Sequence, residues 1–232
     1  METNKEYDFV IIGSGFGGLS CAYILASEGY SVVVLEKNNQ IGGTLQVFSR
    51  DKNIFDTGVH YLGGLDKRQN LYQFFKYFGL LDKLKLKRMD ENGYDIIRFE
   101  DGAEYKYGQG YEKFKKILIN DFPDEKKAIN TFCDKIQEIC KLFPLYNLQN
   151  ETNHDYFSQQ DFRNLNAFDF IASLTKNKRL QNVLAGNNLL FAGIKEKTPF
   201  YIHALILNSY INGAYKLVGG SFQMANIMSE NI

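Results

Sequence analysis

Glycines near the start of the chain have the spacing that a pyrophosphate-binding turn requires. Residues 13–18 read Gly-Ser-Gly-Phe-Gly-Gly and contain the pattern G-x-G-x-x-G. In this pattern Gly13 permits a tight turn, Gly15 lets the backbone approach a pyrophosphate, and Gly18 lets the following helix pack closely on a strand. The free N–H groups at the start of that helix favour the negative charge of phosphates. The turn therefore predicts a dinucleotide site.

A carboxylate follows at the distance along the chain at which such a site needs one. Glu36 lies about twenty residues after the glycines, where it can accept the hydroxyl hydrogens of an adenosine ribose. A glutamate rather than a basic residue at this point argues against a 2′-phosphate, so NADP is the least expected occupant. Lys37 comes directly after Glu36 and is included in the predicted site.

The elements around these residues have the order strand, helix, strand. Residues 8–12 and 31–35 are short apolar runs of the buried-strand type. Between them, Ala22 and Leu25 continue with helical spacing, and Gly29 is placed to cap the helix C-terminus. An ordinary glycine-rich loop is the alternative interpretation. The complete context, with its terminal acid, favours a Rossmann-like βαβ unit.

A second group of glycines distinguishes FAD from NAD. Gly42 and Gly43 precede Thr44, and Gly58 lies in the segment 55–63, which reads Phe-Asp-Thr-Gly-Val-His-Tyr-Leu-Gly. A nicotinamide site gives no reason for further glycines here, whereas a longer flavin needs more places where the backbone approaches it. The alternative is a plain turn, because Gly-Gly is a common turn signal.

These residues also carry a family resemblance. The run from Gly13 through Glu36 to Gly42 and Gly43 resembles the FAD-binding signature of the amine oxidase and phytoene desaturase superfamily. Segment 55–63 resembles the retinol saturase family (all-trans-retinol 13,14-reductases) more than the carotene desaturases, which usually lack its His-Tyr pair. Residues 213–221 are similar to the segment by which these enzymes return from the substrate domain to the flavin domain.

The resemblance implies an α/β fold with a Rossmann-like FAD-binding domain and a helix-rich α+β substrate domain. Residues 1–63 would form the first part of the FAD-binding domain, residues 64–212 an inserted, partial substrate domain, and residues 213–232 the return segment. Family members are longer, so the chain is expected to be an N-terminal fragment that lacks the C-terminal part.

The implied activity of the parent protein is that of a FAD-dependent oxidoreductase. It would reduce a carbon-carbon double bond of a retinoid or isoprenoid polyene, a hydrophobic small molecule, by flavin hydride transfer. A carotene (phytoene-type) desaturase or carotenoid isomerase is the first alternative, and a non-catalytic FAD-binding fragment is the second. The cofactor contacts expected on this basis are Gly13, Ser14, Gly15, Phe16, Gly17, Gly18, Glu36, Lys37, Gly42, Gly43, Thr44 and Gly58.

Candidate catalytic residues lie in the segment that the resemblance places beside the flavin ring. His60 and Tyr61 are the polar side chains there that could supply a proton. For His60, a structural hydrogen bond that orients the loop is the stronger interpretation. For Asp56 we expect a carboxylate that fixes the loop by accepting backbone N–H bonds.

After residue 63 the pattern becomes helix-rich with one hairpin. Residues 94–99 and 104–107 alternate around an Asp-Gly turn, which predicts that hairpin. Residues 147–166 are polar and predict a surface loop, and Ser221 is expected to cap the C-terminal helix. Phe191, Phe200 and Tyr201 could line a polyene pocket, although a core position is the stronger interpretation. The expected helices are residues 68–81, 111–120, 123–142, 168–174, 180–190 and 200–211.

Composition excludes several classes of function. The 27 basic and 27 acidic residues give no net charge, so we expect no nucleic-acid partner. Three cysteines do not suggest a disulfide framework: Cys21 is expected against the sheet, with Cys133 and Cys140 buried on one helix face. No Cys/His cluster has metal-ligand spacing. The first residues lack a secretion signal, so a cytoplasmic location is the default, and peripheral membrane association is only a family-level expectation.

Overall fold

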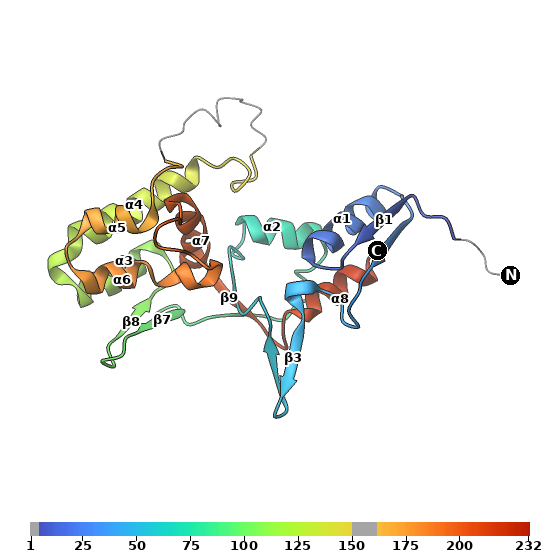
Figure 1. Cartoon of the computed structure of the whole chain (residues 1–232), viewed down its shortest axis with the longest axis horizontal. Coiled ribbons are helices and arrows are strands. Elements are labelled where there is room, and N and C mark those ends of the chain that lie inside the picture. The colour runs from blue at the N-terminus through green and yellow to red at the C-terminus, as the bar shows by residue number, and fades with distance from the viewer. Residues whose placement is uncertain (1–4, 150–161) are drawn as a thin grey trace. The chain divides into compact units, whose positions relative to one another are not determined.

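The structure is a computed structural model that describes residues 5–149 and 162–232 (Figure 1). The chain divides into two compact units. Unit 1 consists of Met1–Leu62, Leu71–Lys87 and Tyr215–Ile232, and unit 2 of Gly63–Asn70 and Arg88–Ala214. Most of the surface loop expected over residues 147–166, with His154, lies outside the described residues.

Unit 1 contains the βαβ unit that the glycine pattern predicts. Strands β1 (Phe9–Ile12) and β2 (Val32–Leu35) are parallel, with Phe9 opposite Val32, and helix α1 (Phe16–Ser27) connects them. Gly29 follows the helix at φ +91°, as a C-terminal cap requires. The two strands are joined at their start, because the Ser31 N–H and hydroxyl both donate to Asp8 Oδ2, at 2.8 and 2.7 Å.

Helix α2 (Asn70–Tyr77) is shorter than the expected 68–81, and residues 71–87 pack in unit 1 rather than with the helix-rich part of the chain. Two backbone positions limit the helix, since Arg68 has φ +77° and Gly79 has φ +65°. The reason for the packing is Phe78, which is 5% exposed and lies edge-on to Phe16 of α1 at 6.0 Å between ring centroids.

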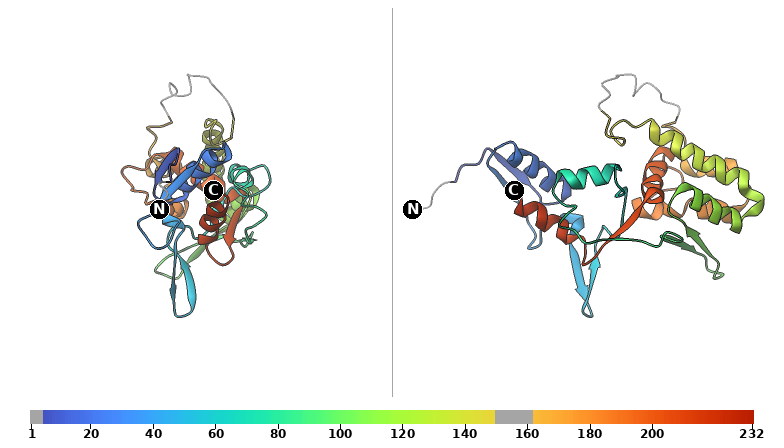
Figure 2. Two further views of the ribbon diagram at one scale, coloured as in Figure 1. Left: turned by 90° about the vertical axis from the view of Figure 1, so that its right-hand side faces the viewer. Right: turned by 180° about the vertical axis from the view of Figure 1, so that it is seen from behind.

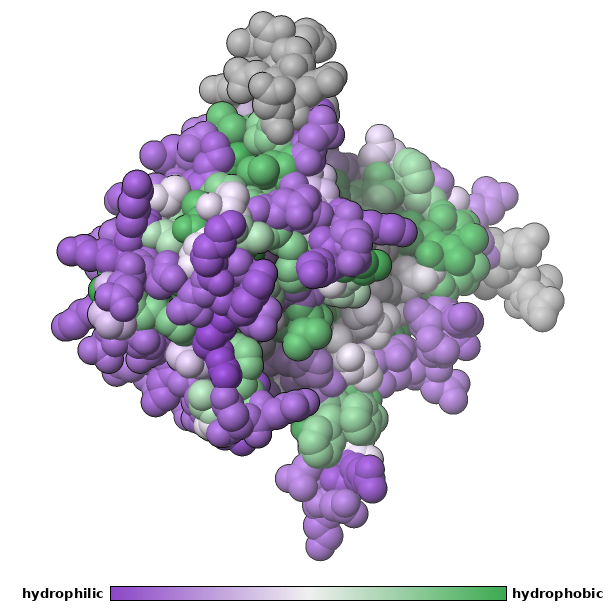
Figure 3. Space-filling model, turned by 60° about the vertical axis from the view of Figure 1, so that its left-hand side comes forward, coloured by the Kyte–Doolittle hydropathy of each residue, from purple (hydrophilic) through white to green (hydrophobic). Residues whose placement is uncertain are grey.

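A hairpin and a C-terminal helix complete unit 1. Strands β3 (Val47–Arg50) and β4 (Asn53–Asp56) pair antiparallel, and helix α8 (Phe222–Glu230) packs against α1. Figure 3 shows hydrophobic surface along the hairpin above a hydrophilic tip. The apolar part includes Phe48 and Phe55, whose rings stack at 5.3 Å and are both exposed.

Unit 2 packs helices around an aromatic and aliphatic core. Its elements are β7 (Asp95–Arg98), β8 (Glu104–Tyr107), α3 (Tyr111–Asp121), η2 (Pro123–Glu125), α4 (Lys126–Lys141), α5 (Ala167–Leu174), α6 (Lys178–Leu184), η4 (Gly186–Phe191) and α7 (Phe200–Asn212). Helices α4, α5 and α7 lie side by side (Figures 1 and 2). The predicted hairpin is present, with Gly102 at φ +85° in its turn. Phe132 and Phe200 are fully buried in this core.

Short strands occur where the chain passes from one unit to the other. Strands β5 (Leu62–Gly63), β9 (Ala214–Leu217) and β6 (Leu86–Arg88) form a three-stranded sheet in the order β5-β9-β6. The boundary between units 1 and 2 falls within each of these three strands.

Three local expectations are wrong. The helix expected over 180–190 is divided into α6, which ends at Leu184, and η4, which begins at Gly186. Glycine is a weak helix former, and this one lies so close to Ile97 of β7 that a Cβ there would overlap its side chain. Cys21 is exposed rather than against the sheet, since α1 turns Leu19 and Ala22 inward. Ser221 precedes α8 but makes no capping bond, and its hydroxyl donates to the Leu45 carbonyl at 3.0 Å.

The expected burial of the other two cysteines on one helix is confirmed. Cys133 and Cys140 are buried, free thiols on α4, and burial raises the pKa of each to about 12.

Among the described residues, no helix combines the length and the apolar character that crossing a membrane would take.

Candidate functional site

The glycine turn at the end of β1 brings the helix and the strand together. Gly13 has φ +96°, a conformation that favours glycine, and its N–H donates to the Leu35 carbonyl at 2.7 Å. A Cβ on Gly18 would overlap the carbonyl oxygen of Gly13. The last glycine of the pattern is therefore needed for packing, as the sequence predicts.

The N-terminus of α1 has the properties of an anion site. Gly15 is the N-cap residue, no side chain caps the helix, and its first turn carries no acidic residue. A Cβ added at Gly15 or at Gly17 would meet no atom within 4 Å. The helix start thus has room beside both glycines, and no side chain of the helix itself caps its first N–H groups, which are free to bind an anion.

Ser14 links the turn to the carboxylate of Glu36. The side chain is 1% exposed, and its hydroxyl donates to Glu36 Oε2 at 2.5 Å, while the Ser14 N–H donates to the same oxygen at 2.9 Å. The N–H of Gly42 lies 3.2 Å from Ser14 Oγ and 3.0 Å from the Ser14 carbonyl. Sequence reasoning included Ser14 only as a member of the turn and missed this connecting role. The available signal was a small hydroxyl residue between two glycines.

Glu36 is held in its charged form. The Asn38 N–H donates to Oε1 at 2.9 Å, and the hydrogen bonds from the Ser14 side chain, from Asn38 and from the Ser14 backbone lower the pKa of Glu36 to about 2. An ionised carboxylate has about four acceptor positions. Ser14 and Asn38 supply three close donors, and the Lys37 backbone adds a weaker one that also lowers the pKa. A ligand hydroxyl would share this carboxylate, and rotation of the Ser14 hydroxyl would open a position for it.

The second glycine pair lies against the first turn. Gly42 (φ +109°) forms a parallel β-bridge with Gly15, and a Cβ on Gly43 would lie 3.0 Å from the Gly15 Cα. The turn η1 (Gly43–Leu45) continues from there. A Cβ on Gly58 would lie 2.9 Å from the carbonyl oxygen of Thr44. The glycines that sequence analysis groups together thus approach one another within unit 1.

The C-terminal segment of unit 1 docks beside these loops. The backbone N–H of Ser221 donates to Asp56 Oδ1 at 2.7 Å, which confirms the expectation that this carboxylate accepts a backbone N–H bond. Gly220 has φ +105°, and a Cβ there would lie 3.2 Å from Val47 Cγ1 and 3.5 Å from Asp56 Oδ1.

The remaining predicted site residues lie at the edge of this arrangement. His60 is exposed and Tyr61 half-buried, on the stretch between β4 and β5. Lys37 is exposed directly after Glu36. Phe16, in the first turn of α1, packs on Phe78. The catalytic and cofactor-binding roles of all these residues stay predictions.

The residues present fit a dinucleotide. A phosphate group matches the uncapped helix N-terminus beside Gly15, and a ribose hydroxyl matches the ionised carboxylate of Glu36. Gly18 has no room for a Cβ, whereas Gly15 and Gly17 leave space beside the helix start in which a ligand could lie. We conclude that unit 1 carries a Rossmann-like site for a dinucleotide cofactor.

Comparison with known proteins agrees with this geometry. Residues 11–78 match the family described as NAD(P)-binding Rossmann-like domain. All-trans-retinol 13,14-reductase from Danio rerio is 29% identical over 243 residues, covering 95% of this chain and 39% of that protein. Prolycopene isomerase 2, chloroplastic, from an Oncidium hybrid cultivar is 26% identical over 246 residues, covering 100% of this chain and 42% of that protein. The chain spans less than half the length of these relatives.

A solved structure supports the same fold. Putrescine oxidase bound to putrescine superposes with a TM-score of 0.60 at 16% identity, covering 97% of this chain and 49% of that chain. The Rossmann match, the two relatives and this structural likeness agree with the resemblance carried by residues 13–43 and 55–63. These similarities support the superfamily of FAD-dependent amine oxidases and phytoene desaturases.

Proposed function

We propose that this chain is the flavin-binding part of a FAD-dependent oxidoreductase that reduces a carbon-carbon double bond of a retinoid or related isoprenoid polyene. The observation that carries the flavin part is the cluster of Ser14, Glu36 and Gly42 beside the open N-terminus of α1. The substrate part is supported by the relative named all-trans-retinol 13,14-reductase. Because the chain spans 39% of that relative, the proposal concerns the whole protein to which this sequence belongs.

The proposed cofactor contacts follow from the chemistry of these residues. Glu36 would accept a hydrogen bond from the adenosine ribose, and the first N–H groups of α1 would bind the pyrophosphate. FAD, when bound, supplies the redox chemistry. Gly43 lies against Gly15, so a dinucleotide bound at the first turn would lie beside the second glycine pair, as proposed for the flavin.

His60 and Tyr61 are the proposed proton donors. In the full-length protein, His60→Gln or Tyr61→Phe would lower turnover by about a hundredfold if the side chain donates in the rate-limiting step. FAD affinity would stay unchanged, because neither side chain belongs to the Ser14 cluster. Full turnover in both variants would leave only the structural role for His60.

Cofactor binding is tested by titrating the chain with FAD and following flavin fluorescence. Glu36→Ala would weaken binding by at least about tenfold, the loss expected for hydrogen bonds to a charged group. The matched control is Glu28→Ala, which removes one exposed carboxylate at the opposite end of α1 and should leave the affinity unchanged. Equal affinities for the two variants would contradict the role assigned to Glu36.

A carotene (phytoene-type) desaturase or carotenoid isomerase is the second candidate, favoured by the relative named prolycopene isomerase 2. Product analysis with the full-length protein separates the reactions. Saturation shortens the conjugated system, shifts absorbance to the blue and adds two hydrogens. Desaturation does the reverse, and isomerisation leaves the mass unchanged.

A non-catalytic FAD-binding fragment is the remaining alternative. It is favoured by the exposed apolar strand residues of the βαβ unit, such as Ile12 (89% exposed) and Val10 (58%), which further polypeptide would cover in a complete domain. Tight FAD binding by a protein that leaves retinoids and carotenoids unchanged would support this alternative.

A further inference from the structure

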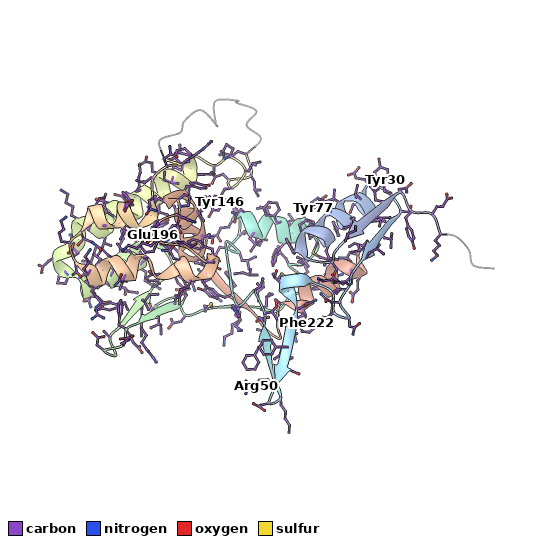
Figure 4. All side chains as sticks on the ribbon, viewed as in Figure 1. Tyr30, Arg50, Tyr77, Tyr146, Glu196 and Phe222 are labelled. Atoms are coloured by element: carbon purple, nitrogen blue, oxygen red, sulfur yellow. The ribbon has the colours of Figure 1, made fainter. Side chains whose placement is uncertain are left out.

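A polar pocket in unit 2 has a lining unlike that of a polyene site. The pocket measures about 210 Å³ and lies between the last turns of α7, the segment 64–70 and the stretch 146–148 after α4. Tyr146, labelled in Figure 4, forms part of its wall. Its amide-bearing side chains are Gln69, Asn70, Asn147, Asn208 and Asn212. A volume of this size suits a small polar molecule, or the polar end of a larger one.

The floor of the pocket is a connected hydrogen-bond network. Asn208 Oδ1 accepts from the Tyr111 hydroxyl at 2.7 Å and from Asn212 Nδ2 at 3.0 Å, while Asn208 Nδ2 donates to the Tyr146 hydroxyl at 2.9 Å. Gln69 Nε2 donates to the Asn212 carbonyl at 2.8 Å. These bonds join four separate stretches of unit 2, so the polar groups of the wall are held in place before any ligand arrives.

The charge of the pocket comes from one residue. Among the residues that line the pocket, Arg68 is the charged one. Tyr146 stays neutral, because burial raises the pKa of its hydroxyl to about 12. In the part of the chain that the structure describes, Arg68 has no ion-pair partner, whereas Arg88 nearby in unit 2 pairs with Asp66 at 3.0 Å. Arg68 is exposed, and a guanidinium with no ion-pair partner among the described residues, beside neutral amides, favours an anion that also accepts hydrogen bonds.

Backbone strain accompanies this chemistry. Five non-glycine residues of the described chain have positive φ, and two of them, Arg68 (+77°) and Leu148 (+55°), line this pocket. Such conformations cluster at ligand-binding segments because surrounding structure must hold them.

We propose that unit 2 binds an organic carboxylate in this pocket, with Arg68 as its counter-ion and the amides of the wall as hydrogen-bond partners. Two sources share this chemistry, a free short-chain acid and the carboxylate end of a long isoprenoid acid. The second source rests on the proposed function, whereas the first does not, and binding to the pocket needs no bound flavin.

Calorimetric titration of the chain with butyrate, with all-trans-retinoate and with neutral butyramide tests the proposal. Saturable binding of one or both carboxylates, and about tenfold weaker binding of butyramide, is the expected result. Binding of retinoate without butyrate would assign the pocket to the longer acid. Absence of binding by both carboxylates, or equal binding of butyramide, would overturn the proposal.

Two variants at position 68 link the binding to the pocket. Arg68→Gly removes the charge and suits the left-handed conformation, so it should fold, and Arg68→Gln removes the charge while keeping a long side chain. Both should weaken carboxylate binding about tenfold. The control Lys67→Gln removes an adjacent, exposed positive charge that does not line the pocket, and should change affinity less than about twofold. Equal losses in all three variants would mean that general charge, and not this site, attracts the anion. Because no flavin is used, these outcomes are independent of the FAD titration.

Discussion

The backbone N–H of Ser221 donates a 2.7 Å hydrogen bond to Asp56 Oδ1, across 165 positions of the sequence. The Ser221 hydroxyl donates in turn to the carbonyl of Leu45 at 3.0 Å. These two bonds hold the C-terminal segment of unit 1 against the end of β4 and the turn η1. The loops that carry the second glycine pair are therefore positioned by residues from both ends of the chain.

Replacement of Asp56 should destabilise unit 1. Asp56→Ala leaves the Ser221 N–H without its charged acceptor, and we expect a loss of about 1–2 kcal/mol in the free energy of unfolding of this unit. Asp56→Asn keeps an oxygen at the same place and should recover most of the loss. Hydrogen exchange of the Ser221 amide and of the β1 and β2 amides measures the effect. Equal protection in the wild type, Asp56→Ala and Asp56→Asn would show that the bond from Ser221 to Asp56 does not stabilise unit 1.

Three glycines of the first turn should respond differently to alanine. At Gly18 the new Cβ would overlap the Gly13 carbonyl oxygen, so Gly18→Ala should cost at least about 1–3 kcal/mol of stability. At Gly17, inside α1, the Cβ meets no atom within 4 Å, and Gly17→Ala should stabilise the helix by about 0.5–1 kcal/mol. Gly15→Ala should leave stability nearly unchanged but weaken FAD binding at least about tenfold, because its Cβ would occupy the space proposed for the pyrophosphate.

Thermal unfolding and FAD titration separate these outcomes. A Gly15→Ala protein that binds FAD as well as the wild type would contradict the position proposed for the pyrophosphate. A stable Gly18→Ala protein would mean that α1 can move away from β1 without loss.

Local patterns predicted the elements whose partners are close in sequence. The apolar runs at 8–12 and 31–35, with Gly29 between them, define β1, α1 and β2 because each strand needs only its neighbour and the connecting helix. The Asp-Gly turn at 101–102 predicts the hairpin β7–β8 for the same reason.

Long-range contacts account for what the sequence did not predict. Ser221 has the right residue type for an N-cap, but its hydroxyl is taken by Leu45, 176 positions away. The close packing of Gly186 involves Ile97 of another element, and Phe78 packs on Phe16. In the candidate site, the glycine spacing predicted where a ligand could approach. For the bond from Ser14 to Glu36 the sequence offers only a small hydroxyl residue between two glycines, and the spacing does not say which way that hydroxyl turns.

Glu36 should make unit 1 sensitive to acid. The pKa of Glu36 is lowered from its ordinary value of 4.5 to about 2, first by the Ser14 hydroxyl. A carboxylate whose folded pKa is depressed contributes stability above its unfolded pKa and loses it as pH falls. The loss should therefore occur between about pH 5 and pH 2. Unfolding midpoints measured across this range should fall less steeply for Glu36→Gln than for the wild type.

Ser14→Ala tests the cause of that shift. Without the hydroxyl, the pKa of Glu36, followed by NMR of the labelled carboxyl carbon, should rise towards its ordinary value. Stability at neutral pH should fall by about 1 kcal/mol, since one partly buried hydrogen bond is lost. An unchanged pKa would assign the effect to the backbone donors of Ser14 and Asn38 instead.

His203 should make unit 2 sensitive to pH in a different range. The imidazole is fully buried on α7, its Nδ1 lies 3.3 Å from Asn188 Oδ1, and among the described residues Nε2 has no hydrogen-bond partner. Burial lowers the pKa of His203 from 6.5 to about 4. The unfolded chain therefore binds this proton first, and stability present above pH 6.5 should fall by roughly 3 kcal/mol as pH decreases to 4.

Replacement by a residue that cannot titrate separates this contribution from the rest. His203→Leu should remove most of the pH dependence of unit 2 between pH 6.5 and 4, as measured by hydrogen exchange of α4 and α7 amides, because no buried imidazole remains to be protonated. The control His60→Gln removes the exposed imidazole of unit 1 and should leave that dependence intact. If His203→Leu destabilised unit 2 equally at both pH values, the imidazole would already be accommodated as a cation in the folded protein. The hydrogen bond with the Leu184 backbone, which acts to raise the pKa of His203, would then be strong enough to offset the cost of burying the charge.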